Sequence, residues 1–221
     1  MATILRDWSY RYPWLYDAIA SVSAIAVGGT DRFRQLALQD LDLPPEATVL
    51  DLCCGGGQAT RYLTALTPNV FGLDASPKAL RRAIHHVPQA TFVEGWAERM
   101  PFEDEQFDLV HTSAALHEME PNQLRQIIKE VYRVLKPGGV FALVDFHAPQ
   151  NPLFMPALAV FLLLFETETS WQLLRTDLPA LLADFQFQNA PDAKAGDRPV
   201  PQAILYAGGS LQVIHAYKPL T

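Results

Sequence analysis

The sequence is short of cysteine, and this shortage excludes one class of protein. Only two cysteines occur among 221 residues, and Cys53 and Cys54 are adjacent. Neighbouring cysteines rarely bridge one another, so the disulfide framework of a small secreted protein is excluded and the cytoplasm is the predicted compartment. The two thiols also lack the ligand spacing of a zinc site, and we predict no metal site.

Basic residues are also few, with 17 against 24 acidic residues and a formal net charge of −7. A nucleic-acid partner usually requires a basic face that displaces counterions from phosphates, so no nucleic-acid partner is predicted. The composition, 49% hydrophobic and 19% charged, is typical of a folded protein rather than a disordered one. A small-molecule ligand suits this acidic charge balance better than a nucleic acid does.

Long apolar runs and dividing linkers are missing as well. The two most apolar stretches are residues 18–27 and 153–165, and the second contains Pro156. Both are too short to span the roughly 30 Å hydrocarbon core of a bilayer, so no transmembrane helix is expected. Peripheral contact with a membrane surface and the oligomeric state stay open. No repeat or polar linker divides the chain, which predicts a single domain over residues 1–221.

Short apolar strands alternate with amphipathic helices through most of the chain. Strands are predicted at residues 48–52, 69–74, 90–94, 107–112 and 140–146, and helices at 58–66, 77–86 and 122–135. Residues 202–206 and 211–216 flank a glycine-rich turn and predict a hairpin. The pattern predicts a three-layer, doubly wound α/β fold whose mostly parallel, seven-stranded sheet has an antiparallel C-terminal strand.

A glycine turn and two acids indicate a nucleoside site at the carboxyl ends of the strands. Asp51 ends the first predicted strand, where an unpaired buried carboxylate would be costly. Gly55 and Gly57 allow a close backbone approach to a ligand and to the following helix. Asp74 follows at the spacing of an acid that accepts ribose hydroxyls. The turn lacks the third glycine of G-x-G-x-x-G, which favours a nucleoside without a pyrophosphate over a nicotinamide dinucleotide.

Five motifs in order resemble those of class I S-adenosylmethionine (SAM)-dependent methyltransferases. They occupy residues 49–57, 71–77, 94–102, 107–117 and 133–139. The phrases Ala-Glu-x-x-Pro-Phe and Leu-Lys-Pro-Gly-Gly are most similar to the ubiquinone/menaquinone-biosynthesis type and related small-molecule methyltransferases. The resemblance implies a Rossmann-like methyltransferase fold, SAM as cofactor with S-adenosylhomocysteine as product, and a small-molecule acceptor.

The resemblance also assigns residues to SAM. The residues it places around the cofactor are Asp51, Cys53, Gly55, Gly57, Asp74, Ala75, Trp96, Ala97, Thr112 and Ser113. Asp74 is placed on the ribose and the backbone of Ala97 on the adenine edge. Two positions depart from the family pattern. Cys53 replaces the first glycine of the turn, so it needs a backbone conformation that a non-glycine residue tolerates. Trp96 stands where an acid often contacts the adenine amine.

The resemblance divides the predicted domain into a core and its covers. Residues 1–45 are expected to form an N-terminal helical cover, 46–146 the SAM-binding core, 149–187 a helical substrate-covering insertion and 202–217 the C-terminal hairpin. The aromatic and apolar character of the two covers favours a hydrophobic or aromatic acceptor, quinone- or lipid-like.

Methyl transfer needs the acceptor held in line with the S–CH₃ bond, and most of the acceleration can come from positioning and water exclusion. A general base is needed only where the acceptor has a proton to lose. His117, His147 and Tyr16 are the candidates for orienting the acceptor or acting as that base. A nicotinamide-dependent oxidoreductase and a catalytically silent SAM-binding protein are the alternatives, and the methylated atom (C, O or N) stays open.

Overall fold

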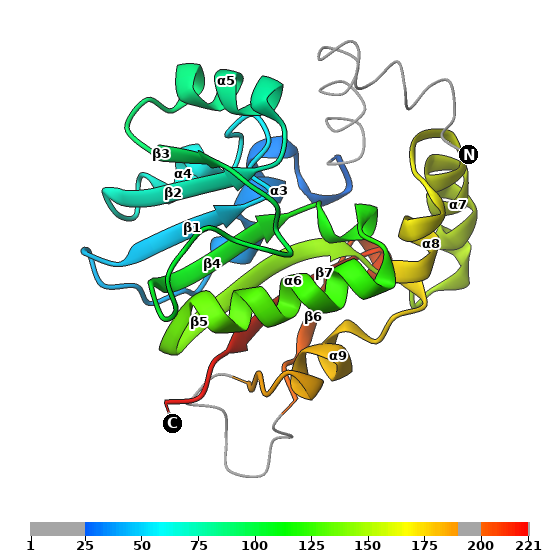
Figure 1. The fold of residues 1–221 in the computed structure, drawn as a ribbon. Helices are drawn as coiled ribbons and strands as arrows, with labels where there is room; N and C mark the ends of the chain where they lie inside the picture. The colour runs from blue at the N-terminus through cyan, green and yellow to red at the C-terminus, as the bar shows by residue number, and fades with distance from the viewer. Residues whose placement is uncertain (1–24, 190–199, 221) are drawn as a thin grey trace.

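The computed structural model describes residues 25–189 and 200–220 of the protein. Its central layer is a seven-stranded sheet in the order β3-β2-β1-β4-β5-β7-β6 (Figure 1). The strands are β1 Thr48–Leu52, β2 Asn69–Asp74, β3 Thr91–Glu94, β4 Phe107–Ser113, β5 Leu135–Phe146, β6 Ala203–Tyr206 and β7 Leu211–Tyr217. Strand β7 is antiparallel to both β5 and β6, and the other pairs are parallel. The predicted Rossmann-like fold is confirmed, with β7 inside the sheet and β6 at its edge.

Helices connect the strands and cover both faces of the sheet. In the described part of the chain, the α-helices are α3 Thr30–Gln35, α4 Thr60–Leu63, α5 Pro77–His86, α6 Pro121–Val134, α7 Met155–Phe165, α8 Glu168–Leu174 and α9 Leu178–Asp184. Short 3₁₀ turns are η1 Ile25–Val27, η2 Leu36–Leu38, η3 Leu116–Glu118, η4 Pro152–Phe154 and η5 Ala207–Gly209. Helices α7 and α8 lie together at one side of the molecule, beside the sheet (Figure 1).

Two apolar clusters, one on each face, hold the three layers together. Phe141 and Leu143 of β5 belong to the cluster that contains the buried stripe of α6. Ala142 and Val144, the alternating residues, belong to the cluster that contains η2 and Leu63 of α4. Successive side chains of a strand point to opposite faces, so a strand buried on both sides is a continuous apolar run. This is why the strands were readable from the sequence.

Two predicted elements differ from the structure by more than one residue at a boundary. Helix α4 covers only Thr60–Leu63, because the residues around it form tighter i to i−3 bonds, such as Ala65 N to Tyr62 O at 3.2 Å. Strand β5 begins at Leu135 and includes the Lys-Pro-Gly-Gly segment, which ends α6 as expected and then pairs with a register shift opposite β4. Gly138, at φ +80°, donates its N–H to Lys218 O at 2.9 Å.

No helix in residues 25–189 and 200–220 has the length and hydropathy needed to cross a bilayer.

Candidate active site

The glycine turn after β1 has three left-handed residues. Cys53, Gly55 and Gly57 have φ values of 57°, 55° and 82°. Cys53 therefore adopts a conformation that a non-glycine residue pays for with roughly 1–2 kcal/mol of steric strain. Gly57 is required by packing as well as by its φ, because a Cβ there would lie 3.3 Å from Cα of Ala83 in α5. The turn is thus clamped between β1 and α5.

Asp51 is buried, and each oxygen of its carboxylate has a partner inside the protein. Its Oδ2 accepts a hydrogen bond from Thr60 Oγ1 at 2.5 Å, and its Oδ1 lies 2.9 Å from His111 Nδ1. Asp51 and His111 are partners in the register of β1 and β4. Asp51 therefore ties the strand end to α4 and to β4 beneath the turn. Sequence reasoning missed Thr60 and His111, because the contact depends on strand register.

Asp74 holds the turn to the start of α5 while retaining hydrogen-bonding capacity. Its Oδ2 accepts the Gly55 N–H and its Oδ1 the Ser76 N–H, both at 2.8 Å. Ser76 caps α5 by accepting the Ala79 N–H. A carboxylate offers about four acceptor positions, so Asp74 can still accept ligand hydroxyls. Its half-buried position at the end of β2 fits a ribose.

The adenine side of the predicted site offers apolar surface. Ala75 is exposed at the end of β2, and Ala97 is buried. Trp96 forms an isolated antiparallel bridge with Arg99 and is 63% exposed. An exposed indole of this size on a rigid segment provides a face on which a purine can pack.

At the end of β4, Ser113 contacts the guanidinium of Arg34, a residue that the sequence analysis did not single out. Thr112 is buried, and its Oγ1 donates to Leu52 O at 3.0 Å. Ser113 receives Arg34 of α3, whose Nη1 lies 3.1 Å from Ser113 Oγ and 3.4 Å from Ser113 O. Arg34 forms no salt bridge within residues 25–189 and 200–220. A half-buried cation with no carboxylate partner among the described residues favours an anionic ligand group at this strand end.

His117 is oriented by Asp145, a buried residue near the carboxyl end of β5. Asp145 Oδ1 lies 2.7 Å from His117 Nδ1, and Oδ2 accepts the N–H groups of Ala115, Leu116 and His117 at 2.8–3.3 Å. Its Oδ1 also accepts the Phe146 N–H at 2.8 Å. Asp145 thus caps the turn η3 rather than the turn that follows β5. The carboxylate fixes the proton on Nδ1 and leaves Nε2 on the opposite side of the ring.

Glu166, at the end of α7, approaches the other side of the same imidazole. Its Oε2 lies 3.5 Å from His117 Nε2, and Ser170 Oγ lies 3.4 Å from that oxygen. Burial alone lowers the pKa of His117, but Asp145 and Glu166 outweigh it and hold the pKa well above its ordinary value. Sequence reasoning missed Glu166, which lies between α7 and α8, because its nearness to His117 depends on tertiary packing such as that of α8 against η3.

An aromatic wall runs from His117 into the insertion. The His117 ring centroid lies 4.6 Å from that of Phe146, which lies 5.9 Å from Phe161 of α7. The ring centroids of Phe161 and Phe165 are 5.5 Å apart. Helix α7 contains no charged residue, and Leu163 on it is exposed. The segment 149–187 therefore presents apolar surface beside a polar group at the carboxyl ends of β4 and β5.

Comparison with known proteins decides the family. Residues 49–139 match the methyltransferase-domain family. The chain is 58% identical to an uncharacterised methyltransferase of Synechocystis sp., over 98% of this chain and 97% of that one. The chain belongs to the class I SAM-dependent methyltransferases. A 2-phytyl-1,4-naphtoquinone methyltransferase of Thermosynechococcus vestitus is 37% identical over 54% of this chain and 55% of that one. A SAM-dependent methyltransferase structure from Methanosarcina mazei is 25% identical with a TM-score of 0.58, over 81% and 95% of the two chains.

The methyltransferase uses SAM, and the nicotinamide-dependent alternative is not favoured. The turn from Gly55 to Thr60 lacks the third glycine that a dinucleotide pyrophosphate requires. Asp74, with acceptor positions left for hydroxyls, and the exposed Trp96 fit the nucleoside part of SAM.

His147 and Tyr16 are the other two candidates for orienting the acceptor of the methyltransferase. His147 follows β5, where its Nδ1 lies 2.9 Å from Gly209 O and its N–H donates to Ser210 O at 3.0 Å. These bonds join it to the β6–β7 turn. Tyr16 lies outside the described residues.

The adjacent cysteines of the methyltransferase are free thiols. Burial, with smaller contributions from Asp74 and Asp51, raises the pKa of Cys53 far above its ordinary value. Burial also raises the pKa of Cys54. Both thiols are therefore protonated at neutral pH, which disfavours a nucleophilic role.

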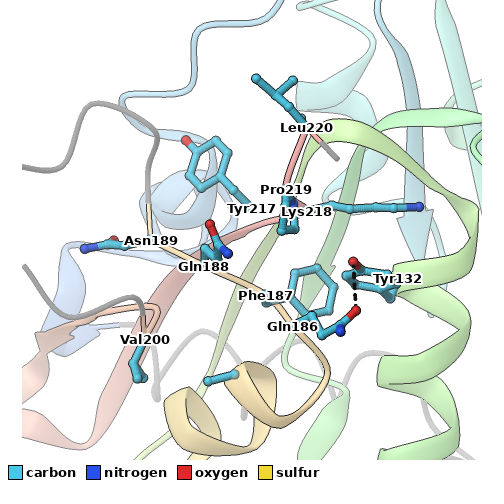
Figure 2. Close-up of a pocket in the computed structure, with 12 residues that line it drawn as sticks. Tyr132, Gln186, Phe187, Gln188, Asn189, Val200, Tyr217, Lys218, Pro219 and Leu220 are labelled. Atoms are coloured by element: carbon cyan, nitrogen blue, oxygen red, sulfur yellow. Dashed lines mark hydrogen bonds between the residues drawn. The ribbon is translucent and has the colours of Figure 1, made fainter.

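A cavity of about 710 Å³ lies away from this site, near the amino end of β5 (Figure 2). Tyr132 and Gln186 face one another in it through a 3.4 Å hydrogen bond, and Lys218 lies close by (Figure 2). Asn189 and Val200, which also line it, flank a segment outside the described residues. The cavity contains none of the predicted site residues.

Proposed function

We propose that the methyltransferase acts on a small hydrophobic or aromatic acceptor, quinone- or lipid-like, by in-line displacement. The observation that carries the proposal is the aromatic wall Phe146–Phe161–Phe165, which leads from the uncharged helix α7 to His117. An acceptor ring packed on this wall would have its polar atom beside the imidazole. The similarity to a 2-phytyl-1,4-naphtoquinone methyltransferase supports the same acceptor class.

The cofactor site in this proposal follows the carboxyl ends of β1, β2 and β4. Asp74 accepts the ribose hydroxyls, and Ala75, Trp96 and the backbone of Ala97 receive the adenine. The turn Cys53, Gly55 and Gly57, with Thr112 and Ser113, faces the methionine half, and Asp51 supports it from beneath. Arg34 binds the methionine carboxylate, because its guanidinium reaches Ser113 and forms no salt bridge with a carboxylate in residues 25–189 and 200–220. When bound, SAM supplies an electrophilic methyl group on a sulfonium.

His117 has the leading role on the acceptor side. Its raised pKa keeps the imidazole protonated at neutral pH, so it donates to an acceptor oxygen and orients it. His147 and Tyr16 remain the further candidates for orienting the acceptor. Helices α7 and α8 exclude water from the reacting atoms. The two free thiols suit a cytoplasmic location, which we include in the proposal.

The test is methyl transfer from radiolabelled SAM to a panel of phytyl naphthoquinols, phenols and polar amines, with mass spectrometry of the products. We expect turnover with the aromatic acceptors. Phe161→Ala should raise the acceptor KM about 10-fold, because burial of one aromatic face contributes on the order of 1.4 kcal/mol. Val160→Ala, on the exposed side of the same helix, should leave it unchanged. Turnover with polar amines alone would refute the acceptor class.

A further inference from the structure

The contact between His117 and Glu166 is too long for a strong hydrogen bond. Nε2 and Oε2 are 3.5 Å apart, whereas charged N–H···O bonds measure roughly 2.7–2.9 Å. The opposite nitrogen of the same ring makes such a bond, at 2.7 Å, with Asp145. The contact between Nε2 and the Glu166 carboxylate is therefore the looser of the two contacts of this ring.

The length of that contact matches the separation of two ligands on one metal ion. Two ligand atoms on a tetrahedral zinc ion, each bonded at roughly 2.0–2.1 Å, lie about 3.3–3.4 Å apart. A third ligand atom is near, because His117, Glu118 and Glu166 each offer one atom and all three lie within 4.8 Å of one another. Two of the three residues come from η3 and one from the end of α7.

We propose that His117 Nε2, Glu166 and Glu118 form a binding site for a divalent transition-metal cation of the zinc type. The site comprises an imidazole nitrogen and two carboxylates, a ligand set that zinc accepts. Three protein ligands would leave a fourth position for a further ligand, as in catalytic zinc sites. Binding of the cation releases the Nε2 proton, so His117 would orient an acceptor oxygen in that fourth position through the cation instead of donating to it directly; only this sentence rests on the proposed function.

The surroundings of His117 support the assignment. A metal-bound histidine usually donates its other ring N–H to a carboxylate, which fixes the ring and the tautomer, and Asp145 occupies that position. Asp145 is itself held by four backbone N–H groups, so the imidazole is preorganised.

The test uses the full-length protein freed of metal with a chelator and titrated calorimetrically with Zn²⁺. A second titration with Co²⁺ is followed by the visible absorption that tetrahedral cobalt gives. We expect saturable binding of one equivalent and a tetrahedral cobalt spectrum. Glu166→Gln should weaken the affinity by about 10–100-fold, because a neutral amide replaces an anionic ligand. Glu168→Gln is the matched control, an identical change at an exposed position on α8 that lies outside the proposed ligand set.

Three outcomes would overturn the proposal: no saturable binding to the wild-type protein, an unchanged affinity in Glu166→Gln, or an equal loss in Glu168→Gln. Glu166 is only partly buried, so its variant is expected to fold, which a thermal melt checks. Binding is measured without SAM or acceptor, so a negative result here leaves the proposed methylation to its own assay.

Discussion

Asp74→Ala is the sharpest test of the cofactor site. The change removes a carboxylate that accepts the N–H groups of Gly55 and Ser76 at 2.8 Å each. In the proposed complex it also removes the charged pair of hydrogen bonds to the ribose. That pair is worth roughly 1.5–3 kcal/mol, which corresponds to a loss of about 10–150-fold in SAM affinity.

The two contributions of Asp74 can be separated with a ligand that lacks one hydroxyl. Calorimetry would measure S-adenosylhomocysteine and its 2′-deoxy analogue on the wild type and on Asp74→Ala. A loosened turn weakens both ligands equally, whereas a lost ribose contact abolishes the difference between them. We expect the wild type to discriminate and the variant not to. Unchanged discrimination in a variant that melts cooperatively would remove Asp74 from the ribose.

Two further substitutions test the turn and its surroundings. Arg34→Met should weaken S-adenosylhomocysteine binding about 10-fold or more by calorimetry, because a charged contact to the ligand carboxylate is lost. Arg32→Met, at an exposed position of the same helix, should leave the affinity unchanged. An equal effect of both changes would contradict the assignment. Gly57→Ala should lower the free energy of unfolding by roughly 1–3 kcal/mol in urea, because strain at positive φ adds to contact with Ala83. Gly29→Ala is the control, because Gly29 also has a positive φ but an added Cβ there would contact nothing within 4 Å. An equal loss of unfolding free energy in Gly29→Ala would argue against the packing role of Gly57.

Sequence predicted the elements whose limits are set by local signals. Strand β2 ends at Asp74 and α5 starts at Pro77 because the apolar run stops and Ser76 caps the helix within a few residues. Strand β5 was predicted to start later, since Lys-Pro-Gly-Gly is typical of a turn. In the structure the Gly138 N–H of this segment donates to Lys218 O, far along the chain. Local chemistry could not predict that bond.

The same distinction applies within the site. The glycine turn and Asp74 form one contiguous strand–turn–helix unit, so their residues were found by spacing. Arg34 reaches Ser113, and Glu166 reaches His117, only because elements distant in the sequence pack together. A lone arginine on a short helix carries no sequence signal for a ligand. A glutamate after an apolar helix resembles an ordinary solvated helix end.

The end of β5 explains why the cofactor was easier to predict than the acceptor. Asp145 fixes His117, and the next residue, Phe146, begins the aromatic wall, so one strand end serves both the polar and the apolar parts of the acceptor side. The other members, Phe161 and Glu166, belong to the insertion. A change in the insertion would therefore alter the surface offered to the acceptor without touching Asp74 or the turn. Acceptor choice then depends on packing between insertion and core, which sequence spacing does not record.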